Sequence, residues 1–285
     1  MLTTAHIDRT VQAALDEDAP WGDLTSEAFI PSDATATASL VAREAGVFSG
    51  GEVFTTAFRL ADPTIRVELH VADGDRFEAG ATLATVTGPA RGVLTAERIG
   101  LNFVQRMSGI ATVAAEYVDA VAHTKARIVD TRKTTPGLRQ FERHAVRSGG
   151  GFNHRFSLSD AVVVKDNHLA VLTADGNLTE ALRCGIAQLP HTTHVEVEVD
   201  RIDQIEPVLE AGIDTIMLDN FTPDELRAGV ALVAGRAIVE ASGGVNLDTV
   251  RQIAEAGVDN ISVGALTHSA RSLDLGLDIA LRQAQ

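Results

Sequence analysis

The chain has 285 residues, of which 45% are hydrophobic and 22% charged, a composition typical of folded globular proteins and unlike that of disordered segments. It contains no apolar run of about 18 residues, and its first residues lack the apolar core of a secretion signal, so we expect a cytoplasmic protein that does not enter a membrane. The formal net charge of −15 argues against binding to nucleic acid, whose phosphates the average field of the chain would repel.

The first part of the chain predicts a small α+β domain. Three stretches, ATASLVAR, IRVELHVADGD and ATLATVTGPARG, alternate polar and apolar residues between Gly and Asp turns, as strands do. A long helical region, LTAERIGLNFVQRMSGIATVAAEYVDAVA, follows, with Gly109 as a candidate break. We place this N-terminal domain at residues 1–112, with the C-terminal segment 270–285 as a candidate addition to it, and a second domain at residues 113–269.

The second domain alternates short β-branched runs with longer helical patterns. Its strand-like runs are RIVD, AVVVK, HVEVEV, DTIMLDN, RAIVEAS and DNISVGA, and EAGIDTIMLDN at 210–220 is echoed by EAGVDNISVGA 45 residues later. Such alternation predicts βα units around a parallel sheet. The fold class is therefore α/β, with an incomplete barrel of the TIM type, whose reactive groups lie at the carboxyl ends of the strands.

Positive charge is concentrated where this domain begins. Between His123 and His168, nine Lys or Arg residues oppose four acids, and all three lysines of the chain lie there. An exposed helix face would also explain such a run. Two loop-like segments within it, DTRKTTPGLR (130–139) and GGGFNHR (149–155), place Arg132, Lys133, His154 and Arg155 after strand or glycine signals. Guanidinium and ammonium groups there suit carboxylate or phosphate, and two such loops at one barrel mouth would neutralise a dicarboxylate.

Lys165 and the acidic residues of later strands are further candidate site residues. Lys165 ends the run AVVV, where it is either an anion ligand or a Schiff-base amine. In VEVEVD the two-residue period puts Glu196 and Glu198 on one face. Glu198 and Asp219 would hold Mg²⁺, directly or through water, or pair with arginines of the basic loops.

Glycine turns follow the last two predicted strands. EASGGVN (240–246) and SVGALTHS (262–269) lie where barrels commonly bind phosphate through backbone N–H groups, although ordinary tight turns also use glycine. HTTH (191–194) follows Pro190 and is predicted to be a loop rather than a metal site. The single cysteine, Cys184, excludes an internal disulfide, and its helix-like surroundings predict a small buried residue without a chemical role.

Taken in order, these motifs resemble those of the quinolinate phosphoribosyltransferases, also called nicotinate-nucleotide pyrophosphorylases (carboxylating). The similarity covers nearly the whole chain and runs through GDLT, LTAER, LNFVQRMSGIAT, DTRKTTPGLR, GGGFNHR, VVVKDNH, VEVEVD, LDNF, EASGGV and VGALTHS. Ser157 departs from the glycine common in the family, which predicts a local loop change. The resemblance implies transfer of phosphoribosyl from 5-phosphoribosyl-1-diphosphate to quinolinate, with release of diphosphate and CO₂ and formation of nicotinate mononucleotide for de novo NAD biosynthesis.

The resemblance also implies roles for individual residues. Those expected around the two carboxylates of quinolinate are Arg98, Arg132, His154, Arg155 and Lys165. Those expected at the phosphoribosyl group are Lys133, Ser242, Gly243, Gly244, Gly264 and His268. Thr131, Val263 and Ala265 are expected to be further substrate-binding residues. Glu198 and Asp219 are expected near the ribose and the Mg²⁺-diphosphate, and the catalytic set is Lys133, Lys165, Glu198 and Asp219.

The family builds its sites between two subunits, so the resemblance implies a homodimer, or a larger assembly of such dimers, with Arg98 donated to the neighbouring site. Three other interpretations compete with this one. The first is a phosphoribosyltransferase acting on nicotinate or another altered substrate. The second is a Schiff-base aldolase using Lys165. The third is a non-catalytic binding protein for phosphate ligands, which would have little use for carboxylates in a cationic mouth.

Overall fold

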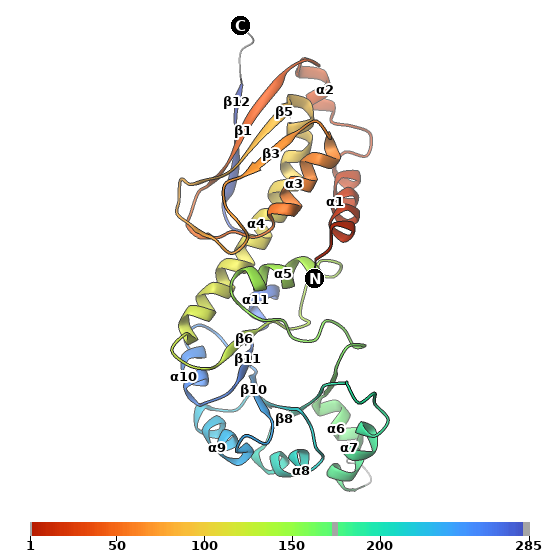
Figure 1. Ribbon diagram of the computed structural model, residues 1–285, viewed down its shortest axis with the longest axis vertical. Coiled ribbons are helices and arrows are strands. Elements are labelled where there is room, and N and C mark those ends of the chain that lie inside the picture. Colours follow the sequence, from red (N-terminus) through yellow and green to blue (C-terminus); the bar gives the residue numbers. More distant parts are fainter. Residues whose placement is uncertain (1, 173–175, 282–285) are drawn as a thin grey trace. The chain divides into compact units, whose positions relative to one another are not determined.

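The computed structural model describes residues 2–172 and 176–281, which divide into two compact units (Figure 1). The first unit comprises Met1–Ala115, Thr135–Gly150 and Ala270–Gln285, and the second comprises Glu116–Thr134 and Gly151–Ser269. The long helix α4 (Ala90–Val121) contains the first point at which the chain passes from one unit to the other.

The first unit contains a four-stranded antiparallel sheet. Its strands follow the order β12 (Leu275–Leu281), β1 (Thr35–Ala42), β5 (Thr82–Pro89) and β3 (Arg66–Leu69), so the C-terminal strand pairs with the first strand of the chain. A small ladder joins β2 (Gly46–Val47) to β4 (Arg76–Phe77). The three strands predicted from alternation are present, and their alternate residues supply one face of the core.

The helices of the first unit are α1 (Thr4–Asp18), α2 (Leu24–Phe29), α3 (Gly51–Ala61), the first part of α4, and α5 (Arg139–Ser148). Of these, α3 and α4 cover the sheet with aromatic and aliphatic side chains, and α1 packs against α3. Phe54 and Phe58 of α3 pack edge to face against each other, with Leu40 and Leu83 from the sheet in the same core. Burial of this mixed layer is what holds α3 and α4 against the strands.

Gly109 does not break the long helix. Helix α4 continues through it, and a Cβ atom at this position would lie 2.0 Å from the carbonyl oxygen of Arg271. The prediction of a break was wrong because glycine serves here to let two backbones approach each other.

The second unit is built on six parallel strands. Their order is β6 (Arg127–Val129), β11 (Asn260–Ser262), β10 (Ile238–Ser242), β9 (Thr215–Asp219), β8 (Val195–Val199) and β7 (Val162–Val164). All six predicted strands are present, which confirms the α/β barrel class. Parallel strands are covered on both faces, and the complete burial of β8 illustrates this.

Helices and turns connect these strands. They are α6 (Asp166–Leu172), α7 (Leu178–Ile186), the 3₁₀ turn η1 (Ile202–Gln204), α8 (Ile205–Leu209), α9 (Pro223–Val233), α10 (Val250–Glu255) and α11 (Ala265–His268). Because each connection returns the chain to the same end of the sheet, the carboxyl ends of all six strands meet on one side.

The predictions for segment 191–194 and for Cys184 have different outcomes. The segment 191–194 is a turn, as predicted, and the His194 ring lies 2.9 Å from Thr215 Oγ1. Cys184, predicted to be buried, is exposed. Helix α7 buries Thr179 and Leu182, and a residue two positions beyond Leu182 faces away from that stripe.

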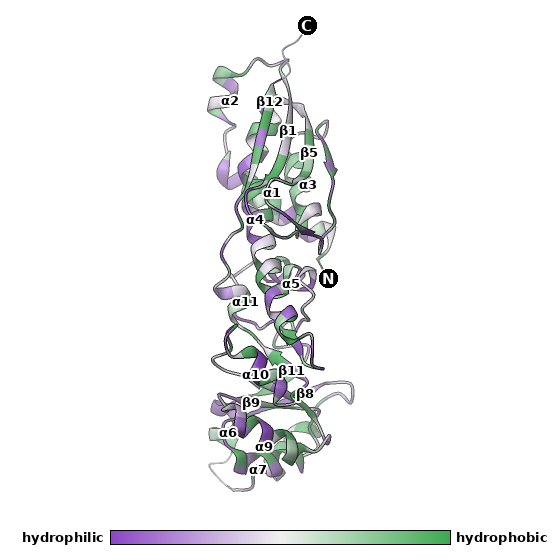
Figure 2. Cartoon of the chain, turned by 90° about the vertical axis from the view of Figure 1, so that its left-hand side faces the viewer, coloured by the Kyte–Doolittle hydropathy of each residue, from purple (hydrophilic) through white to green (hydrophobic). Residues whose placement is uncertain are grey.

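Hydropathy along the helices is mixed, and hydrophobic segments alternate with hydrophilic ones (Figure 2). Within residues 2–172 and 176–281, no helix combines the length and the hydropathy that crossing a bilayer requires.

Candidate active site

The carboxyl ends of the parallel strands surround a cavity of about 430 Å³ in the second unit. Val163, Met217 and Ser262 form part of its wall. Its other lining residues are all predicted site residues: Thr131, Arg132, Lys133, His154, Arg155, Lys165, Glu198, Asp219 and Ser242. The fold thus brings residues from seven separate stretches of the sequence into one site.

Two guanidinium groups give the cavity its anionic preference. Arg132 Nε is buried and has no hydrogen-bond partner in the part of the chain that the structure describes. Burial and the nearby charge of Arg132 lower the pKa of Arg155, whose Nη1 donates to the Ala161 carbonyl at 2.9 Å. Two adjacent cations with an unused donor are stabilised by a bound carboxylate, which can accept hydrogen bonds from both.

Lys165 is engaged in an ion pair. Its Nζ donates to Glu198 Oε2, and Glu198 is 8% exposed whereas the Lys165 side chain reaches the solvent-accessible cavity. The pairing supports the anion-ligand interpretation of Lys165, because a Schiff-base lysine must present an uncharged amine to its substrate.

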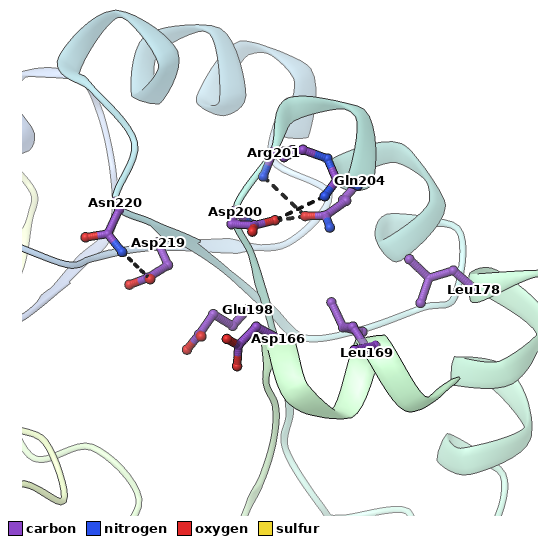
Figure 3. A pocket seen from close by; sticks show the side chains of 10 residues that line it. Asp166, Leu169, Leu178, Glu198, Asp200, Arg201, Gln204, Asp219 and Asn220 are labelled. Carbon is purple, nitrogen blue, oxygen red and sulfur yellow. Dashed lines mark hydrogen bonds and ion pairs between the residues drawn. The ribbon is translucent and has the colours of Figure 1, made fainter. Parts of the chain in front are cut away.

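The acids Glu198 and Asp219 form a boundary between this cavity and a second one of about 550 Å³, which they also line (Figure 3). Asp166 and Asp200 extend the acidic wall of the second cavity, and Asn220 Nδ2 donates to Asp219 Oδ2 at 2.6 Å. Carboxylate oxygens on neighbouring strand ends are the donors that Mg²⁺ prefers, so the residues present fit the predicted ion.

The glycine turns lie next to this wall. Gly243 and Gly244 follow Ser242 directly and have φ angles of +88° and +61°. Gly264 approaches His268 and Lys133, because a Cβ atom there would lie 3.0 Å from His268 Nε2 and 3.2 Å from Lys133 Cδ. The two turns therefore bring their backbones and Lys133 to one side of the barrel mouth, as a phosphate site requires.

Two predicted residues differ from this arrangement. The Val263 side chain is fully buried and its N–H donates to the Val129 carbonyl at 3.0 Å, so neither group is open to a ligand. Arg98 is an exposed residue of α4 in the first unit, and among the described residues it is not part of the cavity lining.

The basic residues between His123 and His168 fall into two groups, one outside the cavity and one that lines it. Lys125 pairs with Asp259 at 2.6 Å, Arg127 lies over the Phe152 ring, and Arg139, Arg143 and Arg147 belong to α5 in the first unit. Among the cations of this window, all of which lie in the described part of the chain, only those that follow strands β6 and β7 or the glycine triplet line the cavity.

Sequence reasoning left several buried polar residues without a role. His154 Nε2 lies 2.9 Å from Glu196 and 3.6 Å from Glu240, and Ser262 Oγ donates to Glu240 at 2.6 Å. Burial lowers the pKa of His154, but the hydrogen bond that its ring donates to Glu196 and the charges of the acids outweigh it, so the net shift is upward. The two-residue period of VEVEV and the position of Glu240 two residues before Ser242 were the available signals.

Ser157 keeps a compact loop without glycine. Its N–H donates to Asp160 Oδ1 at 2.8 Å, and its φ angle is not positive, so a side chain is accommodated without backbone strain.

Comparison with known proteins identifies relatives over almost the entire chain. Residues 23–108 match the model of the quinolinate phosphoribosyl transferase N-terminal domain, and residues 110–278 match that of the C-terminal domain. The chain is 44% identical to the nicotinate-nucleotide pyrophosphorylase [carboxylating] of Mycobacterium leprae, over 98% of this chain and 100% of that protein. It is 41% identical to a probable nicotinate-nucleotide pyrophosphorylase [carboxylating] of Bacillus subtilis, over 93% and 90%.

A solved structure agrees with these matches. The crystal structure of NadC from Streptococcus pyogenes superposes with a TM-score of 0.94 at 40% identity and covers 99% of both chains.

Proposed function

The chain belongs to the quinolinate phosphoribosyltransferase family, and on that premise we propose that it transfers phosphoribosyl from 5-phosphoribosyl-1-diphosphate to quinolinate. The products are nicotinate mononucleotide, diphosphate and CO₂, as a step of NAD biosynthesis. The observation that carries the proposal is the paired guanidinium site, in which a buried Arg132 Nε, without a hydrogen-bond partner among the described residues, lies beside Arg155. Two cations suit a diacid better than nicotinate, which has one carboxylate.

The reaction forms two bonds, N–C1 and C2–H, and breaks two, C1–O to diphosphate and C2–C to the carboxylate. The pyridine nitrogen of quinolinate bonds to C1 of the ribose while the bond from C1 to diphosphate breaks, and positive charge develops on the ribose ring. The nitrogen is then formally positive, so it stabilises the electron pair left at C2 when CO₂ departs, and a proton replaces the carboxylate. No additional decarboxylation cofactor is needed.

The side chains of the cavity match these charges. Arg132, Arg155 and Lys165 bind and orient the carboxylates of quinolinate, which holds its nitrogen toward C1. Glu198 and Asp219 place negative charge where the ribose becomes positive, and Lys133 with the turns at Gly243 and Gly264 binds the phosphate groups. Mg²⁺, held by Glu198 and Asp219 directly or through water, would neutralise the departing diphosphate.

The proposal extends to assembly and location. We propose a homodimer in which Arg98 completes the site of the partner subunit. Arg98 is exposed on α4 in the first unit, whereas the other residues proposed to bind the carboxylates of quinolinate lie in the second unit. A single cysteine, which excludes an internal disulfide, is compatible with the reducing cytoplasm.

An activity assay tests the reaction. The purified protein is mixed with quinolinate, 5-phosphoribosyl-1-diphosphate and Mg²⁺, and nicotinate mononucleotide and CO₂ are measured. Both products are expected in equal amounts, and EDTA is expected to stop their formation until Mg²⁺ is restored. Consumption of nicotinate in place of quinolinate would identify the alternative transferase and contradict the proposal.

Arg132→Ala tests the diacid site. We expect the KM for quinolinate to rise roughly tenfold to 100-fold, because a charged hydrogen-bond donor to the carboxylate is lost. Lys125→Ala is the matched control, since Lys125 belongs to the same charge-rich window but pairs with Asp259 outside the cavity. Equal changes in both variants would show that net charge, and not the Arg132 contact, determines binding.

A further inference from the structure

A layer of buried polar side chains lies one step below the cavity wall. Glu196 and Glu240 precede Glu198 and Ser242 by two residues on β8 and β10, and Ser262 of β11, which lines the cavity, donates a hydrogen bond to Glu240. Because side chains two residues apart point to the same side of a strand, the two acids lie under the predicted site residues. Barrel interiors are normally filled by layers of branched apolar residues, so a polar layer at this depth is unusual.

The acids of this layer converge on His154. The His154 Nε2 atom lies 2.9 Å from Glu196 Oε2 and 3.6 Å from Glu240 Oε1, and Ser262 holds Glu240 through a 2.6 Å hydrogen bond. On the other side of the ring, the backbone N–H of Arg155 donates to Nδ1 at 2.7 Å. This contact matches the tautomer that carries its proton on Nε2, facing Glu196.

Asp130, which directly follows β6, contacts the same segment. It is fully buried, accepts the backbone N–H of His154 at 2.8 Å and accepts Asn153 Nδ2 at 2.6 Å. Three buried acids from three strand regions therefore contact the segment Asn153–Arg155, which supplies two side chains of the cavity.

Burying these carboxylates is costly for the fold. Glu196 and Glu240 are 4% and 3% exposed, and Glu196 Oε1 has no hydrogen-bond partner among the described residues. Burial and the charge of Glu196 raise the pKa of Glu240 to about 7. Apolar residues of similar size would fill the space at lower cost, so the acids are better explained by what they hold than by core stability.

We propose that Asp130, Glu196 and Glu240 are positioning residues that fix the Asn153–Arg155 segment, so that the His154 ring and the Arg155 guanidinium are preorganised for the aromatic diacid. The inference rests on the proposed function for its substrate. It predicts an asymmetric effect, because the three acids contact the segment that carries the proposed quinolinate ligands His154 and Arg155, whereas the proposed phosphate ligands are the turns at Gly243 and Gly264. Weakening the acids should therefore impair binding of quinolinate far more than binding of 5-phosphoribosyl-1-diphosphate.

The test uses the isosteric variants Glu196→Gln and Glu240→Gln and their combination in the full-length protein. The combined variant is expected to raise the KM for quinolinate by roughly tenfold or more, with the KM for the diphosphate substrate changed less than about twofold. Glu240→Asp keeps the charge and should recover part of the loss. Thr215→Val is the matched control, because Thr215 is buried in the same sheet but bonds to His194.

A second readout does not depend on turnover. The imidazole ¹⁵N signals of His154, assigned by their loss in His154→Gln, should shift in both single variants and stay unchanged in Thr215→Val. If the wild-type protein has no activity but the His154 signals still shift in the variants, the proposed function is rejected and the positioning role is kept. Equal changes in both KM values, or unshifted His154 signals, would overturn the inference. So would a stoichiometric metal ion that is present in the wild type and lost from the Glu240→Gln protein, since His154, Glu196 and Glu240 also have the spacing of metal ligands.

Discussion

At the scale of single residues, the turn after β10 shows how backbone geometry limits the site. Gly243 has a φ of +88°, and a Cβ atom there would lie 2.8 Å from the Asn220 backbone nitrogen and 2.2 Å from its Oδ1. Asn220 itself has a φ of +58° at the end of β9. The residues that follow β9 and β10 thus pack closely together, and both have positive φ angles. Their contact lies directly beside Asp219 and Ser242, the last residues of the two strands.

Gly243→Ala should therefore destabilise the protein and impair the site. We expect a loss of about 1 to 3 kcal/mol in the free energy of unfolding, because strain at positive φ adds to a clash with backbone atoms. Activity should fall further than stability alone explains, since Asn220 and its neighbour Asp219 must move. Urea unfolding and steady-state kinetics measure the two effects.

Gly244→Ala supplies the control for that substitution. Gly244 also has a positive φ, +61°, but a Cβ atom there would contact nothing within 4 Å. It should cost about 1 kcal/mol, the penalty for the left-handed conformation alone. Equal losses in the two variants would show that the contact with Asn220 is unimportant.

At the scale of elements, α3 begins without a capping side chain of its own. Its N-cap is Gly50, in the left-handed conformation, and Asp73 from a distant loop accepts the backbone N–H groups of Gly50 and Gly51, each at 3.0 Å. The other oxygen of Asp73 lies 2.6 Å from His144 Nε2 on α5. One carboxylate thus satisfies the start of α3 and joins it to a second helix of the same unit.

Asp73→Ala should remove this cap and its dependence on pH. Burial raises the pKa of Asp73, but the hydrogen bonds from His144, Gly51 and Gly50 outweigh it, so the folded-state pKa is below the ordinary value. A carboxyl group of this kind stabilises the fold above its unfolded-state pKa of about 3.9, and the contribution is lost as the pH falls through the folded-state value.

We expect Asp73→Ala to cost about 1 to 2 kcal/mol at pH 7 and less below about pH 4. Urea unfolding of both proteins at pH 7 and pH 3 gives the comparison. Glu68→Ala, which removes an exposed acid of β3, should change little at either pH. A difference for Asp73→Ala that is independent of pH would indicate that packing, and not the charged cap, is what the substitution removes.

At the scale of the whole molecule, the question is whether one chain contains a complete site. Lys165, Glu198 and Asp219 line one cavity of the second unit, whereas Arg98 is exposed on α4 in the first unit. A two-fold dimer with shared sites would bring an arginine from each chain to the cavity of the other.

Mixing inactive subunits tests the shared site. Arg98→Ala and Glu198→Ala proteins, unfolded and refolded together, should recover about a quarter of wild-type activity, because half of the dimers are mixed and each contains one intact site. Glu198→Ala mixed with Asp219→Ala should recover none, since both residues belong to the same cavity. Recovery in neither mixture would place Arg98 outside the partner's site or the protein outside this dimer type.

Much of this molecule was predictable because its signals are local. The six β-branched runs, the helical patterns between them and the ordered motifs of the basic loops identified the barrel and most of the cavity lining. Alternation and strand-end position depend only on residues close together in the sequence, so both can be recognised without knowledge of the fold. The failures concerned long-range packing: Gly109 is explained by Arg271, and the exposure of Cys184 by which face of α7 is buried.

The sequence by itself determined the order of the strands along the chain, the family and the cations available for an anionic substrate. Only the tertiary structure decided which of nine basic residues in one window share a cavity, and that Glu196, Glu240 and Asp130 meet behind His154. The physical reason is that secondary structure follows local periodicity, whereas the partner of a buried charge depends on the tertiary packing of strands and loops, which brings together residues more than 80 positions apart.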